Sequence, residues 1–308
     1  VVLISGFSIS LAGVNLPNFI TVNHSNSEAY TEFARDQNTC DITIIVGDKT
    51  LHAHKEVLCS RIPFFRDLFN SNMVECTNGE INLSSVFSDF VLPTMERLLD
   101  YVYSGRLIIT SDNVQDLMMG ASFLRIDSIV DECGEFMRRR LTIENIFTLF
   151  FFCRSIAYDR INPYLLEFID TNFVFLSSTV EFLELSIDDL VAFLKRDSLY
   201  VDDEKQAKKK VTRWIDFDIN RTQYAARLFG CVRCCHLSED FIADTVEKTE
   251  SIMNNSDCIA LVEKAKEIQN NIKFIPKRSC EGHHKLFFAF RGVDDCPMGN
   301  FSFQLYDP

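Results

Sequence analysis

The chain has 308 residues, enough for two domains, and 47% of them are hydrophobic, so each domain can bury its own core. The net charge of −13 argues against nucleic acid as a partner, because it repels phosphate backbones. The 11 cysteines lack the regular spacing of a disulfide scaffold and favour a reducing compartment, so we expect a cytoplasmic protein, with nuclear or cytoskeletal locations as alternatives.

The first segment, residues 1–25, is apolar, and no charged residue precedes Glu28. It lacks the basic start of a signal peptide, and Gly6, Gly13 and Pro17 interrupt it as a membrane helix. No uncharged apolar run beyond Glu28 is long enough to span a bilayer, so no membrane partner is expected. We interpret residues 1–25 as an uncertain chain end and exclude them from the predicted fold.

Residues 26–140 predict a mixed α+β domain. Its expected elements, in chain order, are a short helix over 27–36, a β-hairpin over 41–54 with its turn at 47–48, a helix over 55–70, a strand over 80–83, a helix over 91–102 ending at 104–105, a strand over 107–109, and a helix from about 112.

Residues 141–270 predict an all-α domain with few strand signals, so the domain boundary falls near Arg140. Ser186 with Asp189 three positions later resembles a capping box at a helix start, and Asp202 is expected to cap a later helix. The stretch 271–279 is polar, contains Pro276, and predicts a linker.

Several ordered motifs resemble the BTB/POZ domain. They are Asp41 before the first strand, the segments His52 to Leu58 and Phe64 to Phe69, and Tyr101 to Gly105. The second half resembles the BACK domain of BTB–BACK–kelch proteins, through Leu141 to Asn145, Asn172-Phe173, Phe182 to Leu185, Leu199 to Val201, Trp214-Ile215 and Val232-Arg233. Together these resemblances cover residues 26 to 242.

The tail, residues 271–308, resembles a linker followed by the start of a kelch repeat. Lys285 to Gly292 is similar to the first strands of a kelch blade, with Arg291-Gly292 where the family has paired glycines. The resemblance thus implies a BTB/POZ domain, a BACK domain, and possible first β-strands of a kelch propeller.

The resemblance implies a cullin-3-binding surface. Met73 and Glu75 match the family's pattern of an apolar residue, any residue, and Glu, in which an apolar knob enters a pocket on cullin-3 beside a carboxylate. The alternative is a loop Met that covers the domain's own core. Phe65 belongs either to the same surface or to the core. The family's three-box covers residues 141–170.

In the three-box, the phenylalanines 147, 150, 151 and 152 cannot all face one side of a helix, so we expect most of them inside the domain and one or two in the groove.

Two further residue sets are implied by the resemblance. Asp41 and Lys55 match the family's charged pocket, where a buried carboxylate must be paired, and their expected role is structural. The helix that carries Ala29, Tyr30 and Phe33 would swap onto a second subunit in a homodimer.

The remaining candidates have simpler interpretations. The basic clusters Arg138 to Arg140 and Lys208 to Lys210 are interpreted as solvated helix faces. Two groups of cysteines and histidines superficially resemble zinc ligands. The first is Cys231, Cys234, Cys235 and His236; the second is Cys280, His283 and His284. No second cysteine pair completes either group. We expect no metal and no cofactor; buried inert cysteines are the default, and redox sensing is an alternative.

The chain has no phosphate loop, nucleophile elbow or HExxH motif, so we expect a non-catalytic protein. The resemblance implies a dimeric adaptor that recruits a cullin-3 ubiquitin ligase to an unknown protein substrate bound through a kelch region. The alternatives are an actin-associated cytoskeletal scaffold and a transcriptional corepressor platform.

Overall fold

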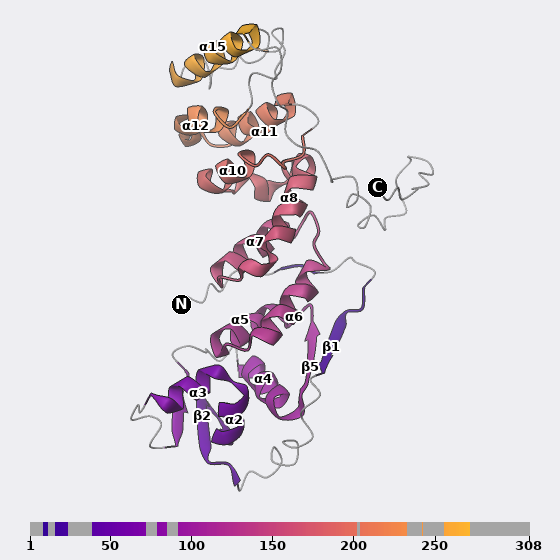
Figure 1. Cartoon of the computed structure of the whole chain (residues 1–308), viewed down its shortest axis with the longest axis vertical. Helices are drawn as coiled ribbons and strands as arrows, with labels where there is room; N and C mark the ends of the chain where they lie inside the picture. The colour runs from indigo at the N-terminus through magenta and orange to yellow at the C-terminus, as the bar shows by residue number, and fades with distance from the viewer. Residues whose placement is uncertain are drawn as a thin grey trace, which may run out of the picture.

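The computed structural model is elongated, with the mixed α+β domain at one end and helix α15 at the other (Figure 1). It describes residues 9–11, 16–23, 39–71, 79–84, 92–201, 204–232, 242 and 256–271. Within these ranges, no helix is both long and apolar enough to cross a membrane.

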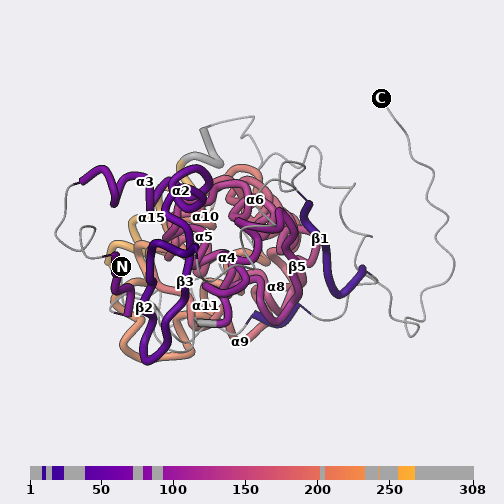
Figure 2. The backbone as a smooth tube through the Cα atoms, turned by 90° about the horizontal axis from the view of Figure 1, so that it is seen from below, coloured from indigo at the N-terminus to yellow at the C-terminus, as the bar shows by residue number. Residues whose placement is uncertain are grey.

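The first domain places helix α4 between two small sheets, as both views show (Figures 1 and 2). One sheet has the strand order β3-β2-β4, and the other pairs β1 with β5. The elements are β1 (Phe19–Asn23), β2 (Ile42–Val46), β3 (Lys49–Ala53), α2 (Lys55–Arg61), α3 (Pro63–Asn70), β4 (Glu80–Asn82), α4 (Leu92–Ser104), β5 (Arg106–Thr110), α5 (Val114–Leu124) and α6 (Asp127–Arg138).

The predicted β-hairpin is confirmed. Strands β2 and β3 are antiparallel, and Val46 faces Lys49 across a two-residue turn. Gly47 in this turn has a φ of 61°, a left-handed conformation that glycine adopts without steric cost. Alternate residues of β2 are buried, so the β-branched run places one face of the strand in the core.

The stretch 55–70 is helical as predicted except at one residue. The chain forms two helices, α2 and α3, with Ile62 between them in an extended conformation (φ −117°, ψ 106°). The cause is Pro63, because a proline ring disfavours the helical conformation of the residue before it. Pro63 itself starts α3, a position where its missing N–H costs nothing.

Part of the excluded segment 1–25 belongs to the fold, which corrects our interpretation of it. Strand β1 pairs antiparallel with β5, from Phe19 opposite Thr110 to Asn23 opposite Arg106. Ile9 and Leu11 are buried in the hydrophobic core. The segment was misjudged because its apolar residues were compared only with signal peptides and membrane helices.

The second domain is entirely helical over the described residues, which with the first domain confirms the predicted fold class. Figure 1 shows its helices stacked in successive layers above α6. They are α7 (Ile146–Ser155), η5 (Asp159–Ile161), α8 (Asn162–Leu176), α9 (Val180–Leu183), α10 (Ile187–Leu194), α11 (Glu204–Asp216), η6 (Ile219–Tyr224), α12 (Ala225–Phe229) and α15 (Ser256–Asn271).

Local polar contacts fix the helices of this domain. Ser186 is the N-cap of α10 as predicted, and its hydroxyl accepts a hydrogen bond from the Asp189 N–H. The buried Asp170 carboxylate on α8 accepts from the Arg196 guanidinium at 2.8 Å and from the Ser198 hydroxyl at 2.6 Å. Trp214 is buried on α11, and its indole N–H donates to the Leu185 carbonyl.

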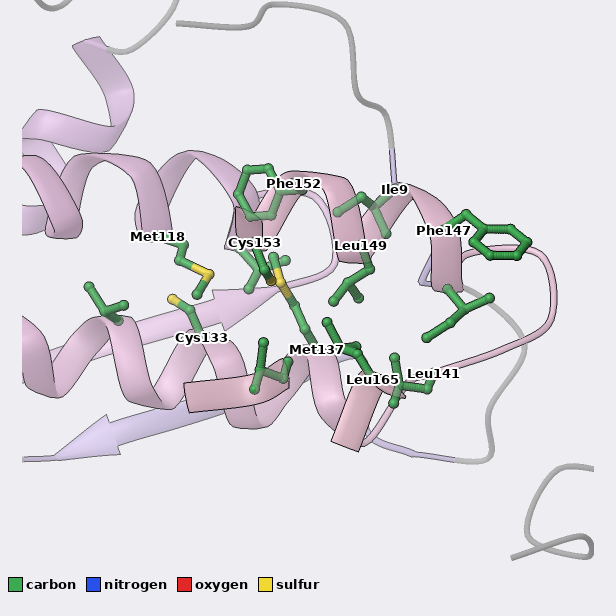
Figure 3. Packing of buried hydrophobic residues seen from close by; sticks show 14 of the residues in the cluster. Ile9, Met118, Cys133, Met137, Leu141, Phe147, Leu149, Phe152, Cys153 and Leu165 are labelled. Carbon is green, nitrogen blue, oxygen red and sulfur yellow. The ribbon is translucent and has the colours of Figure 1, made fainter. Parts of the chain in front are cut away.

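A shared hydrophobic core joins the two domains (Figure 3). Ile9, Met118 of α5, Met137 of α6, Leu149 of α7 and Leu165 of α8 all belong to it. Because the core is continuous across the boundary, we expect the two domains to resist unfolding together.

Helix α6 also approaches the second domain closely at Gly134. A Cβ atom at this position would lie 2.5 Å from the Tyr158 hydroxyl, so only glycine leaves room for that ring. Tyr158 donates a hydrogen bond to Asp131, which also forms an ion pair with Arg160. The close approach therefore brings η5 and its polar contacts against α6.

The interpretation of the basic clusters as solvated faces is wrong for two members. Arg140 is buried, and its guanidinium donates to the carbonyls of Phe136 and Pro17. Lys208 is also buried. Arg138 and Arg139 do lie at the surface, where both pair with Glu135.

Candidate protein-interaction surface

Four described residues, on α3 and at the end of α5, form a surface that we call the α3–α5 edge: Phe64, Asp67, Phe123 and Arg125. The half-buried rings of Phe64 on α3 and Phe123 on α5 lie 4.8 Å apart between centroids. Beside them, exposed Asp67 and Arg125 form an ion pair. An apolar centre with a charged rim is the composition of many protein-interaction surfaces.

Helix α3 is held in place by Arg66. Its guanidinium donates to the Cys59 carbonyl at 2.9 Å and to the Ser60 carbonyl at 3.2 Å, in the last turn of α2. These carbonyls have no partner within their own helix, so Arg66 satisfies them and fixes the angle between α2 and α3. Its role is structural, and the outward face of α3 is left to Asp67.

Met73 and Glu75 lie outside the described residues, between Ser71 and Gly79. The structure does describe the residues on either side of that segment, Ser71 and Gly79, which we call its anchors. Ser71 caps α3 with its hydroxyl on the Leu68 carbonyl, and the Gly79 carbonyl accepts from the Thr43 N–H at 2.8 Å. The segment therefore leaves the end of α3 and returns to the start of β4.

Phe65 is fully buried, which corrects its assignment to the cullin-binding surface. Its ring contacts Phe64 edge-on and stacks with Phe69 at 6.2 Å. Phe65 supports the α3–α5 edge from beneath. The helix period decides this, because Phe65 and Phe69 lie on the inner face of α3.

The phenylalanines of α7 do not all face one side, and two of the four are buried. Phe147 and Phe152 are buried, while Phe150 and Phe151 are half-buried. The Arg154 guanidinium lies 4.9 Å from the Phe151 ring and 5.6 Å from the Phe150 ring. In Figure 1, α7 lies on the same side of the molecule as α3 and α5.

Arg154 is itself fixed by an ion pair with Asp189 at 2.5 Å. Burial raises the pKa of the Asp189 carboxyl, but hydrogen bonds from Arg154 and Ser186 outweigh burial and hold it below its usual range. The pair thus stays charged at neutral pH and ties α7 to α10. Sequence reasoning missed Arg154 as it missed Asp67 and Arg125, although Asp67 lies within the Phe64 to Phe69 motif.

Asp41 and Lys55 meet, but not as a buried charged pair. Both are exposed in this chain, and the contact runs from the Lys55 backbone N–H to the Asp41 carboxylate at 2.7 Å. The Lys55 ammonium lies over the Phe69 ring at 4.7 Å. Asp41 therefore acts as an acceptor at the start of α2, where His54 provides no side-chain cap. Ala29, Tyr30 and Phe33 lie outside the described residues.

The described cysteines are largely embedded in the fold. Burial raises the pKa of the Cys153 thiol to about 12, and burial with the charge of Asp257 raises that of Cys258 to about 11. Such thiols stay protonated at neutral pH and react slowly. Cys231 is buried against the Arg227 carbonyl; the other residues of the two zinc-like groups lie outside the described ranges.

Comparison with known proteins agrees with this architecture. The family model of the BTB/POZ domain matches residues 30–141, and that of the BACK domain ("BTB And C-terminal Kelch") matches residues 146–247. The chain therefore consists of a BTB domain followed by a BACK domain, and it belongs to the BTB–BACK–kelch family.

Curated relatives carry kelch names. The chain is 28% identical to Kelch-like protein 7 of Gallus gallus over 230 residues, 74% of this chain and 39% of that protein. It is 31% identical to Kelch repeat and BTB domain-containing protein 8 of Danio rerio over 206 residues, 66% of this chain and 34% of that protein. It is 28% identical to Kelch-like protein 28 of Mus musculus over 256 residues, which are 81% of this chain and 44% of that protein. The chain thus spans less than half the length of these relatives.

Proposed function

We propose that this chain is a non-catalytic, homodimeric adaptor that binds cullin-3 and brings a protein substrate to the ubiquitin ligase. The observation that carries the proposal is the α3–α5 edge, an apolar pair of rings with a charged rim on a BTB domain that continues into a BACK domain. Ubiquitin transfer would be catalysed by other subunits.

The position of the anchors supports the role proposed for Met73 and Glu75. The segment that carries them starts at the end of α3, next in the chain to the helix that bears Phe64 and Asp67. An apolar side chain there would extend the apolar centre formed by Phe64 and Phe123. Glu75 would add a carboxylate to the charged rim, which favours one orientation of the partner.

The shared core supports a single rigid docking surface across both domains. Phe151 and Arg154 on α7 are held by the BACK domain through the Arg154–Asp189 ion pair, and Leu149 of α7 belongs to the core that includes residues of the BTB helices. A partner that contacts α3 and α7 together would therefore meet a preformed surface and lose less entropy on binding.

The test is the affinity of the purified protein for the N-terminal domain of cullin-3. Replacing Met73 and Glu75 together with alanine should weaken binding about tenfold or more, as for the central residues of an interface. The matched control is Ile108→Ala, which removes an exposed apolar side chain from β5 on the opposite side of the BTB domain in Figure 1.

Thermal unfolding of each variant should match the parent, which excludes misfolding as the cause. Equal affinities of the parent and the Met73/Glu75 variant would refute the assigned contact. Light scattering should give the mass of a dimer, and a monomer at all concentrations would refute the proposed homodimer.

A further inference from the structure

A pocket in the BACK domain opens between α9 and the end of α11, and nothing in the proposed cullin surface uses it. It is an open depression of about 480 Å3, and its lining includes Leu183, Lys208, Lys209, Arg213 and Phe217. Figure 1 shows α11 in a different layer of the molecule from α3 and α5. Its function can therefore be tested separately from cullin binding.

The charge of this pocket is opposite to that of the whole chain. Among the described lining residues, Lys208, Lys209 and Arg213 are basic, and Asp216 is the one carboxylate. The whole chain carries a net charge of −13. A concentration of positive charge on an acidic protein selects an anionic ligand by local attraction.

The lining is held in place by hydrogen bonds behind it. Arg213 donates to the Ser177 carbonyl at 2.6 Å, and Lys210 donates to the Ser178 hydroxyl at 3.0 Å, so α11 is tied to the turn before α9. Arg221 donates to the carbonyl of Leu183, another lining residue, at 2.7 Å and so fixes the end of α9. A site that is already ordered needs little rearrangement to bind.

The two lysines are available to different degrees. Lys208 is only 3% exposed, and burial, with the charge of Lys209, lowers the pKa of its ammonium, although Asp216 partly opposes the shift. Lys209 is exposed and forms no hydrogen bond or ion pair with the described residues. An anion in the pocket would meet the free Lys209 first and would favour the charged form of Lys208.

An exposed apolar residue lines the pocket beside the basic residues. Phe217 in the lining is 57% exposed, and Ile219, two residues further along the chain, is 87% exposed. The Arg221 guanidinium lies 5.2 Å from the Phe217 ring and supports it from one side. Exposed large apolar side chains beside a charged pocket indicate a ligand with both characters, which a simple anion lacks.

We propose that this pocket, with exposed Phe217 in its lining, binds an acidic linear peptide of a partner protein. The carboxylates of the peptide pair with Lys209 and Arg213, and one apolar side chain of the peptide packs on Phe217. Nucleic acid fits less well, because the rest of the chain repels a long polyanion. The BACK domain thereby has a peptide site of its own, distinct from the α3–α5 edge.

The test measures fluorescence anisotropy of a labelled peptide that has a central phenylalanine flanked by glutamates, added to the whole chain. A second peptide has alanine in place of the phenylalanine, and a third probe is a single-stranded oligonucleotide of equal charge. Lys209→Glu should weaken binding of the first peptide about fivefold or more, because it reverses one contact charge. Phe217→Ser should abolish the preference for the peptide with phenylalanine.

The matched control is Lys264→Glu, the same charge change at an exposed position on α15. It should change the affinity less than twofold. Equal losses in the Lys209 and Lys264 variants would mean general charge attraction and would overturn the proposal. So would the absence of peptide binding by the parent, or an oligonucleotide that binds as tightly as the peptide and with the same dependence on Lys209.

Discussion

Asn145 joins the N-terminal segment, the domain boundary and the BACK domain, and its replacement tests whether the two domains form one unit. The residue is 2% exposed. Its amide donates to the Ser10 carbonyl at 3.0 Å and to the Arg140 carbonyl at 2.8 Å, and its oxygen accepts from the Thr142 N–H at 2.9 Å. Alanine removes all three hydrogen bonds and leaves their backbone partners unsatisfied.

The expected cost is about 3 kcal/mol, because each buried hydrogen bond contributes about 1 kcal/mol and three are lost. Urea unfolding followed by Trp214 fluorescence measures it, since this buried indole is the chain's one tryptophan and reports on the BACK domain. Hydrogen exchange of the β2 amides reports on the BTB domain in the same variant. Both probes should show the loss if the core is shared.

The control is Asn220→Ala, which removes one hydrogen bond, from the Asn220 side-chain amide to the Asp218 carboxylate at the surface, and should cost less than about 0.5 kcal/mol. A loss of under about 1 kcal/mol at Asn145, or a shift seen by Trp214 alone, would refute the reasoning. In the second case the domains would unfold independently.

Three further predictions concern stability. Arg196→Met should cost about 3 kcal/mol in urea unfolding, because the carboxylate of Asp170, 1% exposed, loses its charged partner; a cost near zero would contradict the pairing. Ile9→Ala should cost about 2 kcal/mol, and an unchanged midpoint would show that residues 9–11 lie outside the core. Hydrogen bonds from Arg138 hold the pKa of Glu135 at about 2, below its usual value near 4.3. The ionised Glu135 should therefore stabilise the fold fully above about pH 4.3, and this stabilisation should fade as the pH falls from 4.3 towards 2. Glu135→Gln should therefore be less stable than the parent at neutral pH by a small amount and equal to it near pH 2.

The order of elements was largely readable from the sequence, because the signals there are local. The alternation of Ile42 to Val46, the glycine at position 47 and the cap at Ser186 each depend on neighbours a few residues away. That the four α7 phenylalanines cannot share one face followed from the helix period for the same reason.

The errors have local and nonlocal causes. The break at Pro63 was a local signal that the periodicity of the flanking apolar residues hid. The burial of Arg140 was not readable, since its acceptor at Pro17 is 123 residues away in the chain. The pairing of β1 with β5 has the same character.

The sequence by itself therefore indicated the family, through the resemblance of its motifs. It also determined most helices and strands, because hydrophobic period and capping act over a few residues. The tertiary structure alone decided that Phe65 is buried, that residues 9–11 complete the core between the domains, and that Lys208, Arg213 and Phe217 surround one pocket. These facts depend on contacts between distant segments, and the chain must fold before any of them exists.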